Sequence, residues 1–199
     1  MLTRKEVGRQ IMHAGVGIVL ATAYYFEILS SLAVFLGIVV GVLISLISKR
    51  SNKIPIFSWF LRNYERKEDR KNFPGKGLIF YFVGVLLVMQ LFEKDIAIAS
   101  ILILALGDSV SHLFGAKFGQ IKNIFNGDGK KLLEGTLAGT VMGFFGAVLF
   151  VSIPEAFFGS FAAMMFEVIK IDFNEKTLDD NIIVPLIAGT TMFLLRTYL

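Results

Sequence analysis

The sequence predicts an all-α, polytopic membrane helical bundle with about seven transmembrane helices and a cytoplasmic N-terminus. The 199 residues are 55% hydrophobic and only 18% charged, whereas the surface of a soluble domain needs more charge. Long uncharged apolar segments recur along the whole chain, and the basic residues gather in alternate connections. Spans of about 20 residues leave little room for a separate soluble module, so we expect residues 1–199 to form a single integral-membrane domain.

Seven apolar segments follow one another along the chain. They cover residues 11–29, 31–48, 77–92, 96–116, 133–152, 155–169 and 182–197. The first two are joined by a very tight turn near Ser30. The sixth is short and has Glu155 and Glu167 near its ends, so we expect it to lie partly in the membrane interface.

Lysine and arginine are distributed very unevenly between the connections. The N-terminal segment, residues 49–76, the connection after the fourth span and the one before the seventh carry three, nine, four and two of them. The remaining connections and the C-terminus carry none, one, none and one. Basic residues concentrate in cytoplasmic loops, so this alternation places the N-terminus inside and the C-terminus outside. It also explains the net charge of +4 without nucleic acid, which we do not expect as a partner.

The fourth span carries its polar residues on one helical face. Offsets of 0, 3, 4, 7 and 11 place Asp108, Ser111, His112, Gly115 and Gly119 on the same side. A carboxylate inside a span is costly and faces the protein interior or a wet cavity, so Asp108 is the first candidate for a functional residue. The structural alternative is a packing face of small residues, with Asp108 paired to a neighbouring helix.

A glycine- and lysine-rich loop precedes the fifth span. It contains Gly127, Gly129, Lys130 and Lys131. Glycine lets backbone N–H groups approach a phosphate closely, and the lysines add positive charge. Glu134 opens the following helix, where it either caps the helix or holds Mg²⁺. Loops of this composition are also common as solvated turns.

A pair of carboxylates and an amide stands just before the seventh span. Asp179, Asp180 and Asn181 suit a divalent cation that prefers oxygen ligands. The alternative is an N-cap, although one residue would suffice for capping.

Two smaller motifs complete the set of candidates. Residues 74–77 (Pro-Gly-Lys-Gly) enter the third span, where the alternative is a turn that begins a helix. Arg9 and His13 share one face of the first span. A histidine inside a span is more often hydrogen-bonded structure than a functional group, so His13 is a secondary candidate.

Taken together, these motifs resemble the CTP-dependent lipid-alcohol kinases, the family of dolichol kinase, phytol kinase and the CTP-using diacylglycerol kinase of fungi. This family is related to phosphatidate cytidylyltransferase. The resemblance covers nearly the whole chain and rests on the following motifs: Glu6-x-x-Arg9-x-x-x-His13, Glu65-Arg66 with Pro74-Gly75-x-Gly77, Gly107-Asp108 with Gly115 and Gly119, Lys131-x-x-Glu134-Gly135-Thr136, and Asp179-Asp180-Asn181-x-x-x-Pro185.

The chain departs from the family pattern at three positions. Ser111 stands where alanine is common, and Gln10 stands where lysine often follows the arginine. Leu132 replaces a serine or threonine, which removes a hydroxyl that could contact a phosphate. A Pro-Gly-His-Gly-Gly element typical of the cytidylyltransferase branch is absent from the sequence, which favours the kinase branch.

The resemblance implies an integral-membrane kinase that transfers the γ-phosphate of CTP, with Mg²⁺ as cofactor, to the hydroxyl of a dolichol- or polyprenol-like alcohol or a diacylglycerol-like lipid. The active site would face the cytoplasm, in the cell membrane or an endomembrane. The candidate catalytic residues are Asp108, Glu134, Asp179 and Asp180, and those for the metal are Asp108, Asp179, Asp180 and Asn181. The candidates for nucleotide binding are Lys76, Gly107, Gly115, Lys117, Gly119, Gly127, Gly129, Lys130, Lys131, Gly135 and Thr136. Supporting contacts are assigned to Arg9, His13, Gly75, Gly77 and Ser111.

Two other functions remain open at this stage. A CDP-lipid synthase would use the same nucleotide but release pyrophosphate. A small transporter would line a path with Asp108 and His112, although transporters often show an internal repeat and this sequence shows none. The sequence leaves open the identity of the lipid, the choice between Asp108 and the Asp179–Asp180 pair as proton acceptor, and the oligomeric state.

Overall fold

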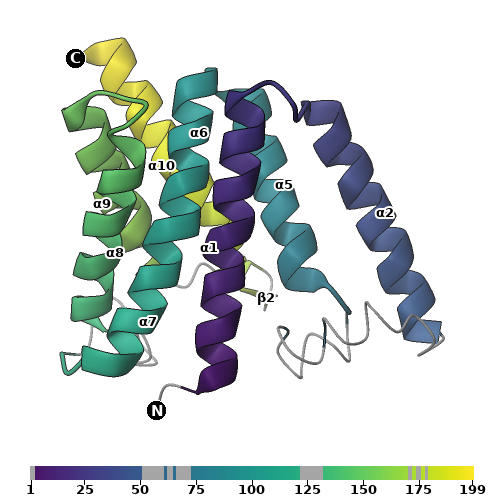
Figure 1. Cartoon of the computed structure of the whole chain (residues 1–199). Coiled ribbons are helices and arrows are strands. Elements are labelled where there is room, and N and C mark those ends of the chain that lie inside the picture. Colours follow the sequence, from purple (N-terminus) through teal and green to yellow (C-terminus); the bar gives the residue numbers. More distant parts are fainter. Residues whose placement is uncertain are drawn as a thin grey trace.

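The computed structural model describes residues 3–50, 61, 65, 73–121, 132–169, 172–173, 176–177 and 179–199. These residues form a helical bundle with one very short β-pair (Figure 1). The elements are α1 (Arg4–Tyr25), α2 (Ser31–Arg50), α5 (Lys76–Leu91), α6 (Lys94–Leu102), η1 (Ile103–Asp108), α7 (Ser109–Phe118), α8 (Leu133–Ala147), α9 (Ile153–Val168), β1 (Asp172–Phe173), β2 (Lys176–Thr177) and α10 (Asp180–Tyr198).

The predicted all-α architecture is confirmed for this part of the chain. Because α6, η1 and α7 are continuous, the described residues contain seven helical rods, and these coincide with the seven predicted segments. The N- and C-termini lie at opposite ends of the bundle (Figure 1). Three of the described helices, Ser31–Ser48, Lys94–Phe118 and Asp180–Tyr198, are long and apolar enough to cross a membrane. Crossing by all seven rods, and the orientation of the N-terminus, remain predictions.

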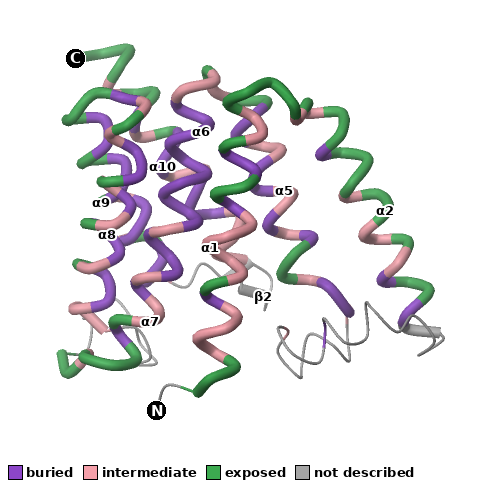
Figure 2. Tube along the Cα trace, in the orientation of Figure 1, coloured by how far each residue is buried: buried purple, intermediate pink, exposed green. Residues whose placement is uncertain are grey.

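The helix formed by α6, η1 and α7 lies at the centre of the bundle, whereas α2 lies at its edge (Figure 2). Within the apolar 18-residue window of each helix, buried residues make up 78% in the central helix but only 17% in α2. Large apolar side chains such as Leu36, Leu43, Phe145 and Leu149 are exposed on the outside of the bundle. Such a surface is a liability in water and is what a lipid-facing helix requires.

Helix ends are fixed by polar side chains at the ends of the bundle. Thr3 accepts a hydrogen bond from the N–H of Glu6 at the start of α1, and Ser152 and Glu155 form a capping box at the start of α9. The fifth predicted segment, 133–152, ends as a helix at Ala147. The apolar residues after it form a turn because the chain must reverse before α9 begins at Ile153.

Small residues allow the central helix to approach α8 very closely. A Cβ atom on Gly139 would clash with the carbonyl oxygen of Gly107 and with Ser111. A Cβ atom on Gly135 would clash with the Ser111 carbonyl and would lie 3.0 Å from the Cα of Gly115. The glycines of both helices therefore set the distance at which Asp108 and its neighbours are held.

Candidate active site

Asp108 is buried in the central helix and is 6% exposed. It is the last residue of η1, a π-helical segment that interrupts the helix between α6 and α7. Such segments inside an α-helix occur frequently at functional sites. Ten residues separate Asp108 from the end of α7, which corresponds to about 15 Å of helix. The carboxylate therefore lies well inside the bundle, on the half that contains the N-terminus.

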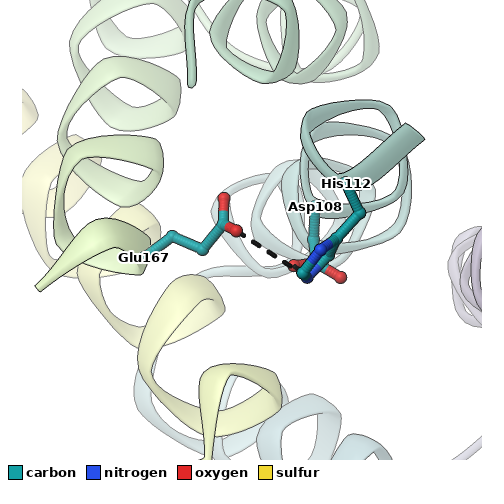
Figure 3. Close-up of side chains that lie close together, drawn as sticks. All are labelled: Asp108, His112 and Glu167. Carbon is teal, nitrogen blue, oxygen red and sulfur yellow. Dashed lines mark ion pairs between the residues drawn. The ribbon is translucent and has the colours of Figure 1, made fainter. Parts of the chain in front are cut away.

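Three side chains converge on this carboxylate, and together with it we call them the Asp108 group: His13, Asp108, His112 and Glu167. His13 of α1 places Nε2 3.3 Å from Asp108 Oδ2, and His112 of α7 places Nε2 3.4 Å from Asp108 Oδ1. Glu167 of α9 places Oε1 3.9 Å from His112 Nε2. Figure 3 shows Glu167 reaching from its helix toward His112 and Asp108, which share one face of the central helix. Three helices far apart in sequence thus contribute to one group.

Tyr81 of α5 borders the group from another side. Its ring meets the His13 ring edge-on, with the ring centroids 4.6 Å apart. Its hydroxyl is buried and has no hydrogen-bond partner among the described residues. A Cβ atom on Gly17 would clash with this hydroxyl, so the Tyr81 side chain reaches from α5 to the backbone of α1 at this level.

The N-terminal turns of α1 carry a second polar network beside the group. Arg9 donates to Glu6 Oε1 at 2.6 Å and Gln10 donates to the same oxygen at 3.1 Å. Burial alone would raise the pKa of Glu6, but these hydrogen bonds and the positive charge of Arg9 hold that pKa below its usual value. Ser109 of α7 donates to the carbonyl of Gln10 at 3.1 Å, which anchors α1 to the central helix next to Asp108.

The predicted motifs of spans three and seven meet each other at the starts of α5 and α10. Lys76 Nζ lies 3.6 Å from Asp179 Oδ2. The side chain of Asn181 donates to Asp179 Oδ1 at 2.8 Å and to the carbonyl of Gly77 at 3.4 Å. Asp179 also accepts the backbone N–H of Asn181 as the N-cap of α10. Asp179 and Asn181 thus link the start of α10 to the start of α5. Their contacts are those of a helix N-cap, which is the alternative to a metal site.

A type II turn leads into α5 through Gly75. The N–H of Lys76 donates to the carbonyl of Phe73 at 3.1 Å, with Pro74 and Gly75 between them. Gly75 has φ 84° and ψ 8°, a left-handed conformation that glycine adopts without strain. The turn that begins a helix is therefore present, and it positions Lys76 and Gly77 against α10.

Glu134 is engaged with the backbone at the end of α7. Its carboxylate accepts the N–H groups of Gln120 and Ile121 at 2.9 and 3.1 Å, and the N–H of Leu133 donates to the carbonyl of Ile121 at 3.0 Å. Glu134 therefore brings the residues on either side of the predicted phosphate-binding loop together. The loop candidates Gly127, Gly129, Lys130 and Lys131 lie outside the described residues.

The remaining residues that were predicted to contact the nucleotide are surrounded mainly by neighbouring helices. Gly107, Gly115, Gly135 and Thr136 are buried, as is Ser111, which was predicted to make a supporting contact. The three glycines lie in the contact between the central helix and α8, and the Thr136 hydroxyl donates to the carbonyl of Leu132 at 3.5 Å. Gly119 ends α7 and packs against Leu132, and Lys117 is exposed with its Nζ 4.9 Å from the Phe118 ring centroid. The small-residue alternative thus accounts for the contacts of these glycines.

Sequence reasoning missed Glu167 as a member of the site. From the sequence, Glu167 is only a reason to place the short sixth segment partly in the membrane interface. Its side chain is only 1% exposed, so it is buried in the bundle. The signal was available, since a carboxylate in an apolar helix faces the protein interior by default. The partnership with Asp108 was not readable, because it depends on how α9 packs against the central helix.

The geometry does not support the predicted Mg²⁺ ligands as one set. Both carboxylate oxygens of Asp179 face donors on Lys76 and Asn181. Among the described residues, the carboxylates and imidazoles that come close enough to share one cation are instead Asp108, His112 and Glu167. This set suits a divalent cation, but its imidazole nitrogen is not a ligand that Mg²⁺ prefers.

Comparisons with known proteins support the family indicated by the motifs. The chain is 25% identical to the CTP-dependent diacylglycerol kinase 1 of Schizosaccharomyces pombe over 222 residues, which cover 96% of this chain and 94% of that protein. It is 29% identical to an uncharacterized protein of Rickettsia prowazekii over 203 residues, which cover 94% of each. No protein-family model matches the chain, and no solved structure matches it. The likeness to the kinase supports a CTP-dependent lipid kinase, and with the apolar helices it supports an integral membrane protein.

Proposed function

We propose that this protein transfers the γ-phosphate of CTP to the hydroxyl of a membrane lipid at the cytoplasmic face. The observation that carries the proposal is the Asp108 group, in which a buried carboxylate is flanked by two imidazoles inside a lipid-exposed bundle. Intramembrane ionisable residues are functional by default. The end-to-end similarity to a CTP-dependent diacylglycerol kinase supplies the reaction class.

The acceptor side of the reaction is assigned to the Asp108 group. A lipid hydroxyl on an apolar tail enters this depth from the bilayer, and the γ-phosphate of the nucleotide approaches it from the N-terminal end of the bundle. As the hydroxyl oxygen forms its bond to the γ-phosphorus, it releases a proton. Asp108 and the imidazoles of His13 and His112 are neighbouring groups that accept it. Asp108 is the residue on which this step depends, because both imidazoles face its oxygens.

The donor side is assigned to the N-terminal end of the bundle. Lys76 lies there beside Asp179, and Glu134 ties together Ile121 and α8, on either side of the predicted phosphate-binding loop. Phosphoryl transfer requires alignment and charge neutralisation more than covalent catalysis by the protein. The β–γ bond of the nucleotide breaks as the new bond forms, and CDP leaves with the electron pair on its terminal phosphate oxygen.

The acceptor class is a lipid with a single free hydroxyl, and diacylglycerol is the first substrate to test. The relative of S. pombe is named for this lipid. Dolichol- and polyprenol-like alcohols present the same hydroxyl on apolar tails and form the second class.

The decisive experiment uses the purified full chain in lipid vesicles with CTP labelled on its γ-phosphate. Diacylglycerol and a polyprenol are supplied in separate reactions. We expect the label to enter the lipid fraction and CDP to be released. Release of pyrophosphate would identify a cytidylyltransferase instead. No nucleotide-dependent labelling of either lipid would contradict the proposal.

A further inference from the structure

We infer that Asp108, His112 and Glu167 bind a divalent first-row transition ion in preference to Mg²⁺. The inference deepens the proposed function, because the ion would occupy the acceptor side of the reaction. Its binding can nevertheless be measured without nucleotide or lipid, so it can fail or hold independently of the kinase activity.

The first argument is the spacing of the ligand atoms. One atom from each of the three residues lies within 4.8 Å of the other two, with His112 Nε2 3.4 Å from Asp108 Oδ1 and 3.9 Å from Glu167 Oε1. Ligand bonds of about 2.1 Å at tetrahedral angles place ligand atoms about 3.4 Å apart. Charge-assisted hydrogen bonds to an imidazolium are shorter, at about 2.7–2.9 Å. The observed distances fit ligands around a common ion better than direct ion pairs.

The second argument comes from a fourth residue, His13. Its Nε2 atom is buried and has no hydrogen-bond partner among the described residues. The same atom points at the second oxygen of Asp108, at 3.3 Å. His13 therefore presents a further ligand atom from α1, next to the carboxylate oxygen of Asp108 that His112 does not face.

The third argument concerns which ion the set prefers. Mg²⁺ takes oxygen ligands in near-octahedral geometry and keeps several waters. Imidazole nitrogen suits ions such as Fe²⁺, Ni²⁺ and Zn²⁺, and Mn²⁺, which carboxylates also bind, serves as the spectroscopic probe. A site with one imidazole and two carboxylates, and a second imidazole beside it, matches the mixed donor sets of transition ions. Three protein ligands also leave a coordination position open, as in catalytic metal sites.

Burial makes such an ion chemically useful. The side chains of Asp108 and Glu167 are 8% and 1% exposed. An ion held between them would be shielded from water, and its charge would therefore act more strongly on a neighbouring group.

The experiment measures metal binding to the detergent-purified full chain after removal of metals with a chelator. Mn²⁺ is added alone, and the bound ion is counted by equilibrium dialysis and followed by electron paramagnetic resonance. We expect one Mn²⁺ per chain, nitrogen coupling to the bound Mn²⁺ in spin-echo spectra, and displacement by Zn²⁺ at concentrations at least about tenfold lower than by Mg²⁺.

Matched variants of α9 provide the control. Glu167→Gln and Glu155→Gln remove the same charge from the same helix, but only Glu167 lies in the Asp108 group. E167Q and H112N should weaken Mn²⁺ binding by at least about tenfold, whereas E155Q should change it by less than about twofold.

Three results would overturn the inference. They are the absence of stoichiometric Mn²⁺ binding to the wild-type chain, equal competition by Mg²⁺, and a bound Mn²⁺ without nitrogen coupling. The wild-type measurements remain informative even where E167Q or H112N fails to fold. A wild-type chain that binds Mn²⁺ as described but phosphorylates neither lipid would uphold the metal site and reject the proposed function.

Discussion

Two polar clusters in this bundle use similar residues for different purposes. We call the second one the Arg196 cluster: Arg196, Glu93, Asp95 and Glu155. The Arg196 guanidinium contacts Glu155, Glu93 and Asp95 at 2.6, 2.7 and 2.8 Å, the lengths of charge-assisted hydrogen bonds. Within the Asp108 group the corresponding distances between nitrogen and oxygen are 3.3–3.9 Å. There the carboxylates face the imidazoles of His13 and His112 where the Arg196 cluster has a guanidinium.

The Arg196 cluster is a structural ion-pair network, which we call the structural clasp, whereas the Asp108 group is the candidate reactive site. The Arg196 cluster joins the end of α10 to the beginnings of α6 and α9, and its permanent positive charge closes the network. The four members of the Asp108 group are two carboxylates and two imidazoles, so the charge on these four side chains changes with protonation or with a bound ion. The kind of cation that a buried carboxylate cluster faces therefore indicates whether the cluster has a structural or a catalytic role.

The largest expected effect is that of Asp108→Asn. The substitution keeps the shape of the side chain but removes its charge, so it should reduce phosphate transfer by about 10³-fold or more while the protein still folds. Transfer from labelled CTP measures the first effect, and the elution profile in detergent measures the second. Wild-type turnover by D108N would remove Asp108 from the active site and abolish the distinction between the two clusters.

Arg196→Met tests the other half of the comparison. The variant leaves three carboxylates without their shared cation, and the cluster is partly exposed, so we expect a loss of about 2 kcal/mol in stability. For a chain of this size that corresponds to about 4–8 °C in the apparent Tm in detergent. Transfer per folded molecule should stay within about twofold of the wild type. A large loss of activity at unchanged Tm would show that the Arg196 cluster is not a structural clasp.

Gly135→Ala tests whether helix packing or nucleotide contact explains the glycines near the Asp108 group. An added methyl group would meet the carbonyl of Ser111, and such overpacking costs about 1–3 kcal/mol. The control is Gly15→Ala in α1, where no atom lies within 4 Å of the added Cβ and the change should be neutral or stabilising. A weaker apparent affinity for CTP in G135A at unchanged Tm would favour the nucleotide contact instead.

The roles of these glycines could not be predicted from the sequence, although the helices and Asp108 could. The helices were predictable because uncharged apolar runs of about 20 residues usually form membrane helices. All seven predicted segments coincide with helical rods. Asp108 was predictable because an intramembrane carboxylate is rare and costly. Whether Gly115 faces a phosphate or Gly135 of another helix depends on a distance between helices, and no local pattern encodes that distance.

The partners within the Asp108 group were predictable only in part. His112 follows Asp108 by four residues, so a helix places both on one face. Glu167 and Tyr81 reach the group from α9 and α5, and their positions follow from tertiary packing. The π-helical segment before Asp108 also changes the register of the helix, which simple helical offsets from the preceding residues cannot anticipate.

The smallest expected effect on stability concerns Lys76, at the opposite end of the bundle from the Arg196 cluster. Its pair with Asp179 is long and partly exposed, so Lys76→Met should cost less than about 1 kcal/mol. If Lys76 also contacts the nucleotide, the KM for CTP should rise by about tenfold with little change in kcat, because a charge that binds ground state and transition state alike affects mainly KM.

Lys94 provides a matched control for this last substitution. It pairs with Glu27 at 2.8 Å, near the same end of the bundle as Arg196, and Lys94→Met removes the same charge from a similar helix start. K94M should leave the KM for CTP unchanged. Equal effects of K76M and K94M would mean that the KM reports overall charge rather than a nucleotide contact. A selective effect of K76M would place the donor side at the starts of α5 and α10, one end of the bundle away from the structural clasp.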